Sequence, residues 1–166
     1  MLMIPSPIGA PLAAVTAQSP RSPALSATGG DGGGAPGEEK PFRILIVEDE
    51  VIAAMDLEAQ LLRLGHEVVE LAHSAPDAVQ AACLHRPDLV LMDIRLARGT
   101  SGIDAATQIH DQLGIRSIFV TAHSDPGLRQ IASAANPLDF VIKPYSRFQI
   151  ELALKAAARR LRPGST

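Results

Sequence analysis

The sequence has a single cysteine, no long apolar run and no excess of basic residues, and each of these absences excludes a class of protein. Cys83 has no second cysteine for an intramolecular disulfide, and no cysteines and histidines have zinc-site spacing. No apolar run approaches the roughly 20 residues of a membrane-spanning helix. The formal net charge is -3. We therefore expect a soluble, cytoplasmic protein that binds neither membranes nor nucleic acid.

The N-terminal segment differs in composition from the rest of the chain. Up to Pro41 it is rich in Pro, Ala, Ser and Gly, and it shows no sustained helical or strand period. It has no basic n-region, and three prolines interrupt its apolar residues, so it does not resemble a signal peptide. We expect residues 1–41 to form a disordered tail and residues 42–162 to form one folded domain.

After Phe42, short apolar runs alternate with segments of helical period, which is typical of βαβ units. Four runs are continuously apolar, as strands covered by helices on both faces must be. A fifth run is more polar and suits a strand near a sheet edge. The five predicted strands are 44–47, 67–72, 89–92, 118–120 and 140–142.

The segments between these runs carry helix start and stop signals. Ser74, followed by Pro76, is typical of a helix N-terminus, and Gly114 is typical of a residue just beyond a helix. In the fourth helix we expect Leu128, Ile131 and Ala135 to share one face. The predicted helices cover approximately 54–64, 74–82, 101–113, 124–135 and 150–161.

This alternation predicts an α/β fold. We expect a doubly wound (βα)5, flavodoxin-like three-layer sandwich with a parallel sheet of strand order 2-1-3-4-5. Right-handed crossovers bring the carboxyl ends of all strands to one rim. The chain reverses direction between strands one and three, and ligands bind at this position in such sheets.

Polar residues follow four of the predicted strands at that rim. Strand one runs into Glu48 and Asp49, strand three into Asp93, strand four into Thr121 and strand five into Lys143. Three carboxylates at one point repel each other unless one binds a proton or the group binds a cation. Oxygen ligands in an open, hydrated site favour Mg²⁺. The sequence therefore predicts a magnesium site at the rim.

The same residues suit phosphoryl transfer. A carboxylate can act as a nucleophile and form an acyl phosphate, a reaction that needs mainly positioning and charge neutralisation. Asp93 follows the central strand, between the acidic pair and the strands of Thr121 and Lys143. A lysine and a threonine hydroxyl are suitable donors to phosphoryl oxygens. Asp93 is therefore the predicted nucleophile.

Four motifs in this order, ILIVEDE, LVLMDIRL, IFVTAHS and FVIKPYS, resemble the response-regulator receiver domains of two-component systems. The resemblance covers about residues 42–161. It implies that Glu48 and Asp49 hold Mg²⁺ together with Asp93 and the backbone carbonyl of Arg95. It also implies that Asp93 accepts the phosphoryl group and that Lys143 contacts it.

The resemblance further implies a conformational switch. Thr121 moves toward the phosphoryl group while Phe140 changes rotamer, which alters the surface of helix four, strand five and helix five. Pro144 follows Lys143 as in the family, where the intervening peptide is typically cis. The stretch DIRLARGTSGIDAA is similar to single-domain and stress-response receivers of alphaproteobacteria.

Two features depart from the family pattern. Residues 136–139, Asn-Pro-Leu-Asp, replace the Gly or Ala that many receivers carry before the aromatic residue, which affects the conformation of that loop. Arg95 and His123 occupy positions that in the family tune dephosphorylation.

The implied function is a phosphoprotein in a histidine-to-aspartate phosphorelay. A sensor histidine kinase or a phosphotransfer protein would donate the phosphoryl group. We expect no output domain after the fifth helix and expect the signal to reach a separate downstream protein. The surface of helix four, strand five and helix five could also pair two copies of the chain. We expect no enzymatic activity beyond self-phosphorylation and dephosphorylation.

Three other functions compete with this interpretation. An aspartate-based phosphohydrolase of the haloacid dehalogenase type needs a second carboxylate two residues after its nucleophile, and Arg95 occupies that position. A Rossmann-type nucleotide site needs a G-x-G-x-x-G motif after strand one, which is missing. A pseudo-receiver that docks a partner without phosphorylation has no need of the acidic, hydroxyl and lysine residues. Cys83 is interpreted as a packing residue.

Overall fold

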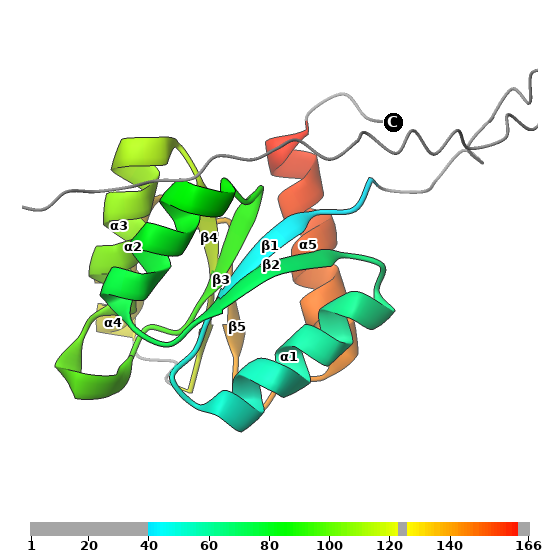
Figure 1. Cartoon of the computed structure of the whole chain (residues 1–166), viewed down its shortest axis with the longest axis horizontal. Coiled ribbons are helices and arrows are strands. Elements are labelled where there is room, and N and C mark those ends of the chain that lie inside the picture. Colours follow the sequence, from blue (N-terminus) through cyan, green and yellow to red (C-terminus); the bar gives the residue numbers. More distant parts are fainter. Residues whose placement is uncertain (1–39, 123–125, 163–166) are drawn as a thin grey trace, which may run out of the picture. The chain divides into compact units, whose positions relative to one another are not determined.

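The computed structural model describes residues 40–122 and 126–162. The described part of the chain alternates strands and helices as the sequence predicts (Figure 1). Most of the predicted tail, with His123 and the predicted start of the fourth helix, lies outside these residues. The elements are β1 (Arg43–Val47), α1 (Val51–Arg63), β2 (Glu67–Ala72), α2 (Ala75–His85), β3 (Leu89–Met92), η1 (Ala97–Gly99), α3 (Gly102–Leu113), β4 (Arg116–Thr121), α4 (Pro126–Ala132), η2 (Ser133–Ala135), β5 (Asp139–Ile142) and α5 (Arg147–Leu161).

The strands form one parallel sheet of order β2-β1-β3-β4-β5, as predicted. β2 lies at one edge, as its more polar sequence indicates. Val47 pairs with Met92 where β1 and β3 end, and Thr121 pairs with Ile142 where β4 and β5 end. The residues that follow these strands therefore emerge at the same rim.

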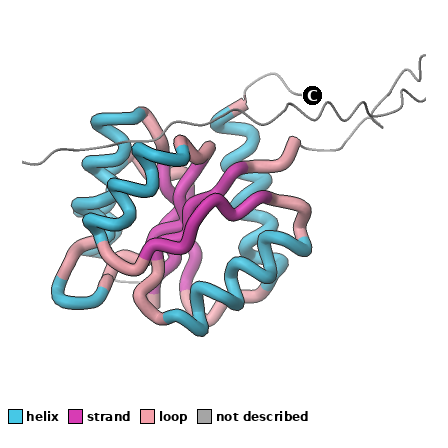
Figure 2. Tube along the Cα trace, in the orientation of Figure 1, coloured by secondary structure: helices cyan, strands magenta, loops and turns pink. Residues whose placement is uncertain are grey.

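Helices cover both faces of the sheet (Figure 2). Along β1, Leu45 and Val47 belong to the core shared with α2, α3 and α4, while Ile44 and Ile46 belong to the core shared with α1 and α5. All four side chains are at most 1% exposed. The continuous apolar runs therefore reflect burial on both faces of the sheet.

The helix boundaries follow the predicted signals. Ser74 and Ser101 cap α2 and α3, because each hydroxyl accepts a hydrogen bond from a backbone N–H of the first turn. Gly114 ends α3 in the left-handed conformation, with φ of 70°. At α5 the Ser146 and Gln149 side chains form a reciprocal capping box that the sequence analysis did not identify.

The fourth helix departs from the prediction. α4 has 7 residues and continues as the short 3-10 helix η2. Its buried side carries Ala132 and Ala135, with Leu128 partly buried, whereas Ile131 is 62% exposed. The expectation that Ile131 shares the face of Leu128 and Ala135 is therefore wrong. The small Ala132 side chain lets the helix approach the core, and Ile131 turns outward.

Cys83 also departs from the prediction. On α2 the buried positions are Ala78, Ala81 and Ala82, so the following residue turns away from the core. Cys83 is exposed and does not pack in the interior as expected. Since α2 meets the core through its alanines and Val79, the cysteine is not needed to fill space there.

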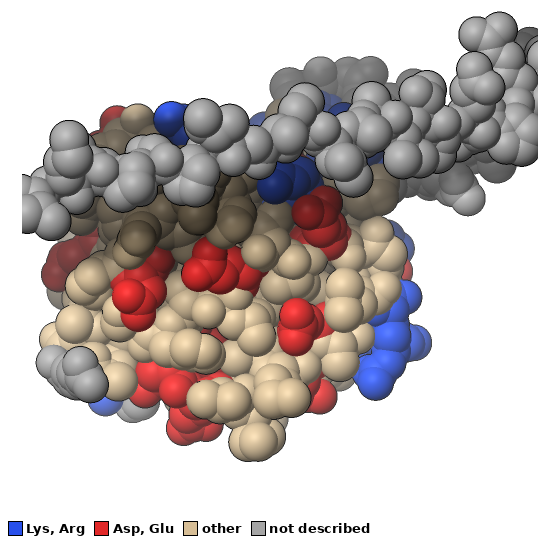
Figure 3. Space-filling view, viewed as in Figure 1, with Lys and Arg blue, Asp and Glu red and all other residues tan. Residues whose placement is uncertain are grey.

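Acidic side chains are spread across the face that carries β2 and α1, and basic side chains gather toward its edges (Figure 3). Where Figure 3 shows described residues on this face, the basic side chains form no broad field. Among the described residues, no helix is both long enough and apolar enough to cross a membrane.

Candidate functional site

Three carboxylates meet at the rim of the sheet, as predicted. Glu48 and Asp49 follow β1, and Asp93 follows β3, the neighbouring strand. Each offers an oxygen atom, and these oxygens lie within 4.8 Å of one another. Glu48 and Asp93 are only 2% and 8% exposed, while Asp49 is half-buried. Such concentrated negative charge in a largely buried position requires a compensating cation or a proton on one of the acids.

Lys143 supplies part of that compensation. Its Nζ donates to Oε2 of Glu48 at 2.5 Å and to Oδ2 of Asp93 at 2.7 Å. Burial lowers the pKa of Lys143, but hydrogen bonds to Asp93 and Glu48 and their charges outweigh it, so this pKa lies above its usual value. The ammonium group therefore stays charged and holds the two acids together.

Burial also changes the pKa of Glu48. Burial raises the pKa of the Glu48 carboxyl above its usual value, the hydrogen bond and charge of Lys143 lower it in part, and the charge of Asp93 raises it further. Its ionised form is therefore costly in this position. Binding of a further cation would relieve that cost.

The Asp93 carboxylate is held at both oxygens. Oδ1 accepts a hydrogen bond from the backbone N–H of Arg95 at 3.1 Å, while Oδ2 accepts from Lys143. The Asp93 backbone N–H donates to the carbonyl of Val47 at 2.9 Å. These contacts orient the side chain toward the acidic pair. The role of the Arg95 carbonyl as a metal ligand stays a prediction.

Gly102 contributes to the site through close packing. A Cβ atom on Gly102 would lie 1.8 Å from the carbonyl oxygen of Asp93, so no side chain fits there. The Gly102 backbone N–H donates to the carbonyl of Ile94 at 2.9 Å. The start of α3 therefore lies directly against the backbone of Asp93. The sequence analysis did not single out this glycine, since its requirement comes from a tertiary approach.

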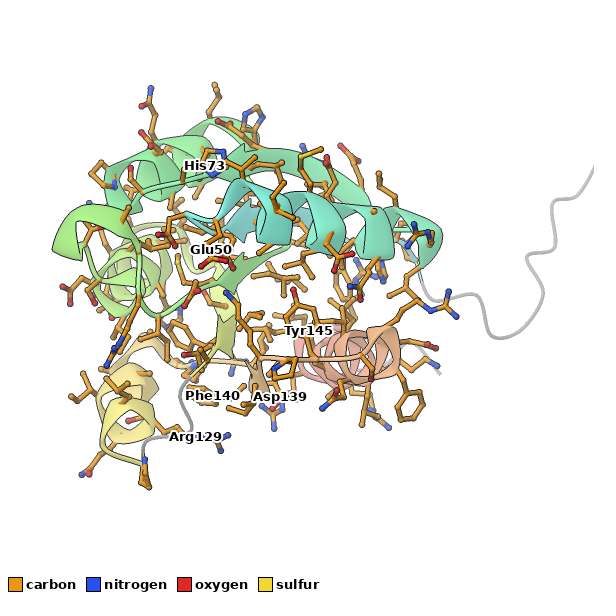
Figure 4. The ribbon with its side chains drawn as sticks, turned by 90° about the horizontal axis from the view of Figure 1, so that it is seen from below. Glu50, His73, Arg129, Asp139, Phe140 and Tyr145 are labelled. Carbon is orange, nitrogen blue, oxygen red and sulfur yellow. The ribbon has the colours of Figure 1, made fainter. Side chains whose placement is uncertain are left out.

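His73 is a second residue that the sequence analysis missed. Its Nδ1 lies 2.8 Å from the backbone carbonyl of Glu48, and the Glu48 N–H donates to the carbonyl of Ala72 at 3.0 Å. Because a carbonyl can only accept, Nδ1 carries the proton. In Figure 4 the His73 ring lies beside the segment that carries Glu50. Its position directly after β2, at the same rim, was the available signal.

The two predicted switch residues lie on β4 and β5, on the same side of Asp93 as Lys143. Thr121, at the end of β4, is 2% exposed, and its carbonyl accepts from the backbone N–H of Lys143 at 2.8 Å. The Phe140 ring stacks on Phe119 with centroids 5.5 Å apart. The guanidinium carbon of Arg129 lies 5.1 Å from the Phe140 ring centroid, so the ring contacts both β4 and α4 (Figure 4).

The loop before Phe140, which departs from the family pattern, has a defined conformation. Asn136 ends η2 in the left-handed region, with φ of 48°, which asparagine tolerates well. Arg116 donates from Nε to the Asn136 carbonyl at 2.8 Å and from Nη2 to the Pro137 carbonyl at 3.2 Å. These hydrogen bonds fix the backbone of the loop just before β5 begins. The peptide between Lys143 and Pro144 is cis, as the resemblance implies.

The donor set matches a hard divalent cation. Carboxylate oxygens from Glu48, Asp49 and Asp93 converge, and this is the ligand type that Mg²⁺ takes in sites that also receive phosphate oxygens. Lys143 and Thr121 lie on the opposite side of Asp93, at the ends of β5 and β4. The arrangement can hold a cation on one side of the Asp93 carboxylate and an anionic group on the other.

Comparisons with known proteins support the resemblance to receiver domains. The sequence profile of the response regulator receiver domain matches residues 44–155. The transcriptional regulatory protein PdtaR of Mycobacterium tuberculosis is 38% identical over 122 residues, which cover 74% of this chain and 59% of PdtaR. The chemotaxis protein CheY of Bacillus subtilis is 34% identical over 121 residues, which cover 72% of this chain and 97% of CheY.

A solved structure gives the same result at the level of the fold. The anti-anti-sigma factor PhyR from Bartonella quintana is 33% identical, with a TM-score of 0.63 over 72% of this chain and 48% of PhyR. The chain therefore spans about half of PhyR and about three fifths of PdtaR.

Proposed function

The chain belongs to the response regulator receiver domain family, and from this premise we propose that Asp93 accepts a phosphoryl group in a histidine-to-aspartate phosphorelay. The observation that carries the proposal is the placement of the Asp93 carboxylate. It is 8% exposed and lies between two further acids and the Lys143 ammonium. A structural aspartate gains nothing from two neighbouring carboxylates, whereas a phosphoacceptor that binds a divalent cation needs them.

Glu48, Asp49 and Asp93 would hold Mg²⁺ through their carboxylates, with the backbone carbonyl of Arg95 as a further ligand. When bound, Mg²⁺ neutralises negative charge on the acids and on the incoming phosphoryl oxygens. The Asp93 carboxylate attacks phosphorus and forms a new O–P bond, while the bond from phosphorus to the donor's leaving group breaks. The backbone N–H of Arg95 holds one Asp93 oxygen in place during this attack.

Lys143 and Thr121 would act on the product. The Lys143 ammonium already contacts Asp93 and moves with little displacement onto a phosphoryl oxygen. The Thr121 hydroxyl, at the end of the adjacent strand, donates a second hydrogen bond. The acyl phosphate adds roughly two negative charges to this rim, which biases the positions of these two side chains.

The response would pass through Phe140. Its ring is half-buried between Phe119 and Arg129, so a change in its rotamer alters the surface formed by α4, β5 and α5. We propose that this surface binds a separate downstream protein, or a second copy of the chain. The relative PhyR is named an anti-anti-sigma factor, which makes a regulator of transcription initiation the first partner class to test.

A sensor histidine kinase or a phosphotransfer protein would supply the phosphoryl group in the cytoplasm. The chain would act on no small-molecule substrate other than its own phosphodonor. The exposed side chain of Arg95 stands two residues after Asp93, where a phosphohydrolase of the haloacid dehalogenase type needs a carboxylate. Self-phosphorylation and dephosphorylation are the reactions that the site supports.

Intact-mass measurement tests the proposal. The protein is incubated with acetyl phosphate and Mg²⁺, and the same reaction is run with EDTA, with Asp93→Ala and with Asp56→Asn, which alters an exposed acid on α1. We expect a gain of one phosphoryl group in the wild type and in Asp56→Asn, and none in Asp93→Ala or with EDTA. Circular dichroism checks that each variant is folded.

No adduct on the folded wild type, either from acetyl phosphate or from candidate kinases, would contradict the proposal. That result would instead support a receiver that docks its partner without phosphorylation. An adduct that persists in Asp93→Ala would place the chemistry on another residue.

A further inference from the structure

A groove runs between α3 and the α4–η2 segment, and its lining includes none of Glu48, Asp49 and Asp93. Its cavity volume is about 500 Å³. The α3 wall is mostly polar and includes two aspartates, and the opposite wall is apolar. The side chains that matter for the argument are Ile103, Asp104, Asp111, Ile131 and Ala134.

Asp111 is unfavourable for the helix that carries it. It lies in the last turn of α3, which ends at Leu113, and it is exposed. The C-terminal end of a helix carries partial negative charge, so a carboxylate there is repelled, and aspartate is also a poor helix former. Within the described residues, none of the ion pairs includes Asp111. Helix stability therefore does not explain this residue.

Ile131 is equally unfavourable on the opposite wall. Its side chain is 62% exposed, on a helix of only 7 residues. A β-branched apolar residue at an exposed helical position favours neither the helix nor contact with water. Two residues that oppose local stability thus line the two walls of one groove. Departures of this kind from local preference are expected where a surface has a binding role.

The distance between the two aspartates limits which binding partner can contact both of them. Asp104 and Asp111 lie seven residues apart on α3, which is two helical turns or roughly 10 Å. Asp104 itself suits the first turn of α3, where a carboxylate is favourable. The described residues provide no ion pair for Asp104 either. Two carboxylates that form no ion pair within the described residues therefore lie on one wall of the groove, opposite an apolar wall.

We propose that this groove binds an amphipathic helix of a partner protein. That helix carries lysine or arginine residues seven positions apart, which face Asp104 and Asp111, and an apolar side chain between them that covers Ile131. Charge complementarity selects a basic partner, and a groove between two helical segments suits an amphipathic helix that lays its apolar face into the groove. The groove is distinct from the α4–β5–α5 surface, and its binding requires no phosphorylation of Asp93.

A synthetic helix probes the groove directly. The probe is an alanine- and glutamine-based peptide of about 18 residues, long enough to form several turns. It carries two lysines seven positions apart and a leucine midway between them, and its control carries glutamates in place of the lysines. Titration into the isotope-labelled full chain is followed by amide chemical shifts. We expect saturable shifts confined to α3, α4 and η2 with the lysine peptide and none with the control.

Variants separate binding from folding. We expect Asp111→Asn to weaken the lysine peptide by about threefold to fivefold and Ile131→Ala to weaken it by roughly tenfold. Neither variant should lower the thermal unfolding midpoint, because each removes a locally unfavourable residue. Glu58→Gln and Leu62→Ala change a carboxylate and an exposed leucine on α1, across the sheet, and should leave peptide binding unchanged.

Three results would overturn the proposal. The first is the absence of saturable shifts on α3 and α4, or equal shifts with the glutamate control. The second is a lowered unfolding midpoint in Asp111→Asn, which would show that the residue is structural. The third is concentration-dependent shifts on α3 and α4 in the protein alone, which would show that a second copy occupies the groove.

Discussion

Lys143 and Asp93 are joined by a contact of 2.7 Å between Nζ and Oδ2, although they lie 50 residues apart in the sequence. The contact spans β4, since Asp93 follows β3 and Lys143 follows β5. It therefore forms only when these three strands are aligned. The same ammonium contacts Glu48, so one cation balances acids from two different strands.

Removal of that cation should destabilise the protein at neutral pH. In Lys143→Met two buried carboxylates face each other without a counter-ion. We expect the free energy of unfolding to fall by about 2 kcal/mol, less than for a fully buried pair, because the lysine side chain is 21% exposed. Urea denaturation measures the loss. As a control, Lys155→Met breaks a solvent-exposed pair on α5 and should cost far less. Equal losses would contradict the account.

The raised pKa of Glu48 predicts how the stability of the fold depends on pH. The contribution of Glu48 to the free energy of unfolding should fall as pH rises, whereas that of an ordinary ion-paired surface acid rises. Burial raises the pKa of the Glu48 carboxyl above its usual value, so between the two values the folded protein binds more protons than the unfolded chain. The stabilisation from its protonation is present below the unfolded pKa and is lost as pH rises through the folded pKa. Lys143, whose pKa is also raised, loses its contribution only in strongly alkaline solution.

The neutral isostere tests this prediction. We expect Glu48→Gln to match the wild type in acid and to exceed its stability at pH 7 by about 1 kcal/mol. Thermal unfolding across the acidic to neutral range, without divalent cations, measures the difference. A variant that is less stable than the wild type at pH 7 would show that the ionised Glu48 is favourable in the fold.

Gly102 should tolerate no side chain. In Gly102→Ala the Cβ atom would lie 1.8 Å from the Asp93 carbonyl oxygen, so the backbone must shift. We expect a loss of about 3 kcal/mol in guanidinium denaturation, together with slower phosphorylation at the displaced Asp93. Gly114→Ala is the matched control: its φ is 70° and no atom lies within 4 Å of the added Cβ, so it should lose about 1 kcal/mol. Similar losses in both variants would rule out the packing explanation.

Arg129 should influence the orientation of Phe140. Its guanidinium carbon lies 5.1 Å from the ring centroid, a contact worth about 0.5 to 1 kcal/mol at an exposed site. We expect Arg129→Met to broaden or shift the Phe140 ring resonances in NMR spectra and Arg129→Lys to restore them. Arg147→Met, on the exposed first turn of α5, is the control. Unchanged ring resonances in Arg129→Met would exclude this coupling.

Much of the fold was predictable because burial on both faces leaves a clear pattern. The runs Ile44–Val47 and Leu89–Met92 are continuously apolar, and the structure shows both as central strands. The positions of Glu48, Asp93 and Lys143 followed from strand ends, since parallel strands place their carboxyl ends together. The predicted helix cap at Ser74 also held, because a cap depends on residues that are close in the sequence.

The features that were missed depend on tertiary approach. Ile131 fits a helical period as well as Ala132 does, and only packing against the core decides which one is buried. The requirement for Gly102 arises from the backbone of Asp93, nine residues earlier. His73 contacts Glu48 because β2 pairs with β1. In the sequence alone, a histidine after a strand looks the same whether it makes such a contact or is solvated.

Reductive trapping tests the central claim most directly. Borohydride converts an aspartyl phosphate to homoserine, and peptide mapping by mass spectrometry identifies the residue that changed. After reaction with acetyl phosphate and Mg²⁺, we predict homoserine at position 93 and at no other aspartate. Homoserine at position 49, or no conversion in a protein that gained the phosphoryl mass, would contradict the assignment of Asp93 as the phosphoacceptor.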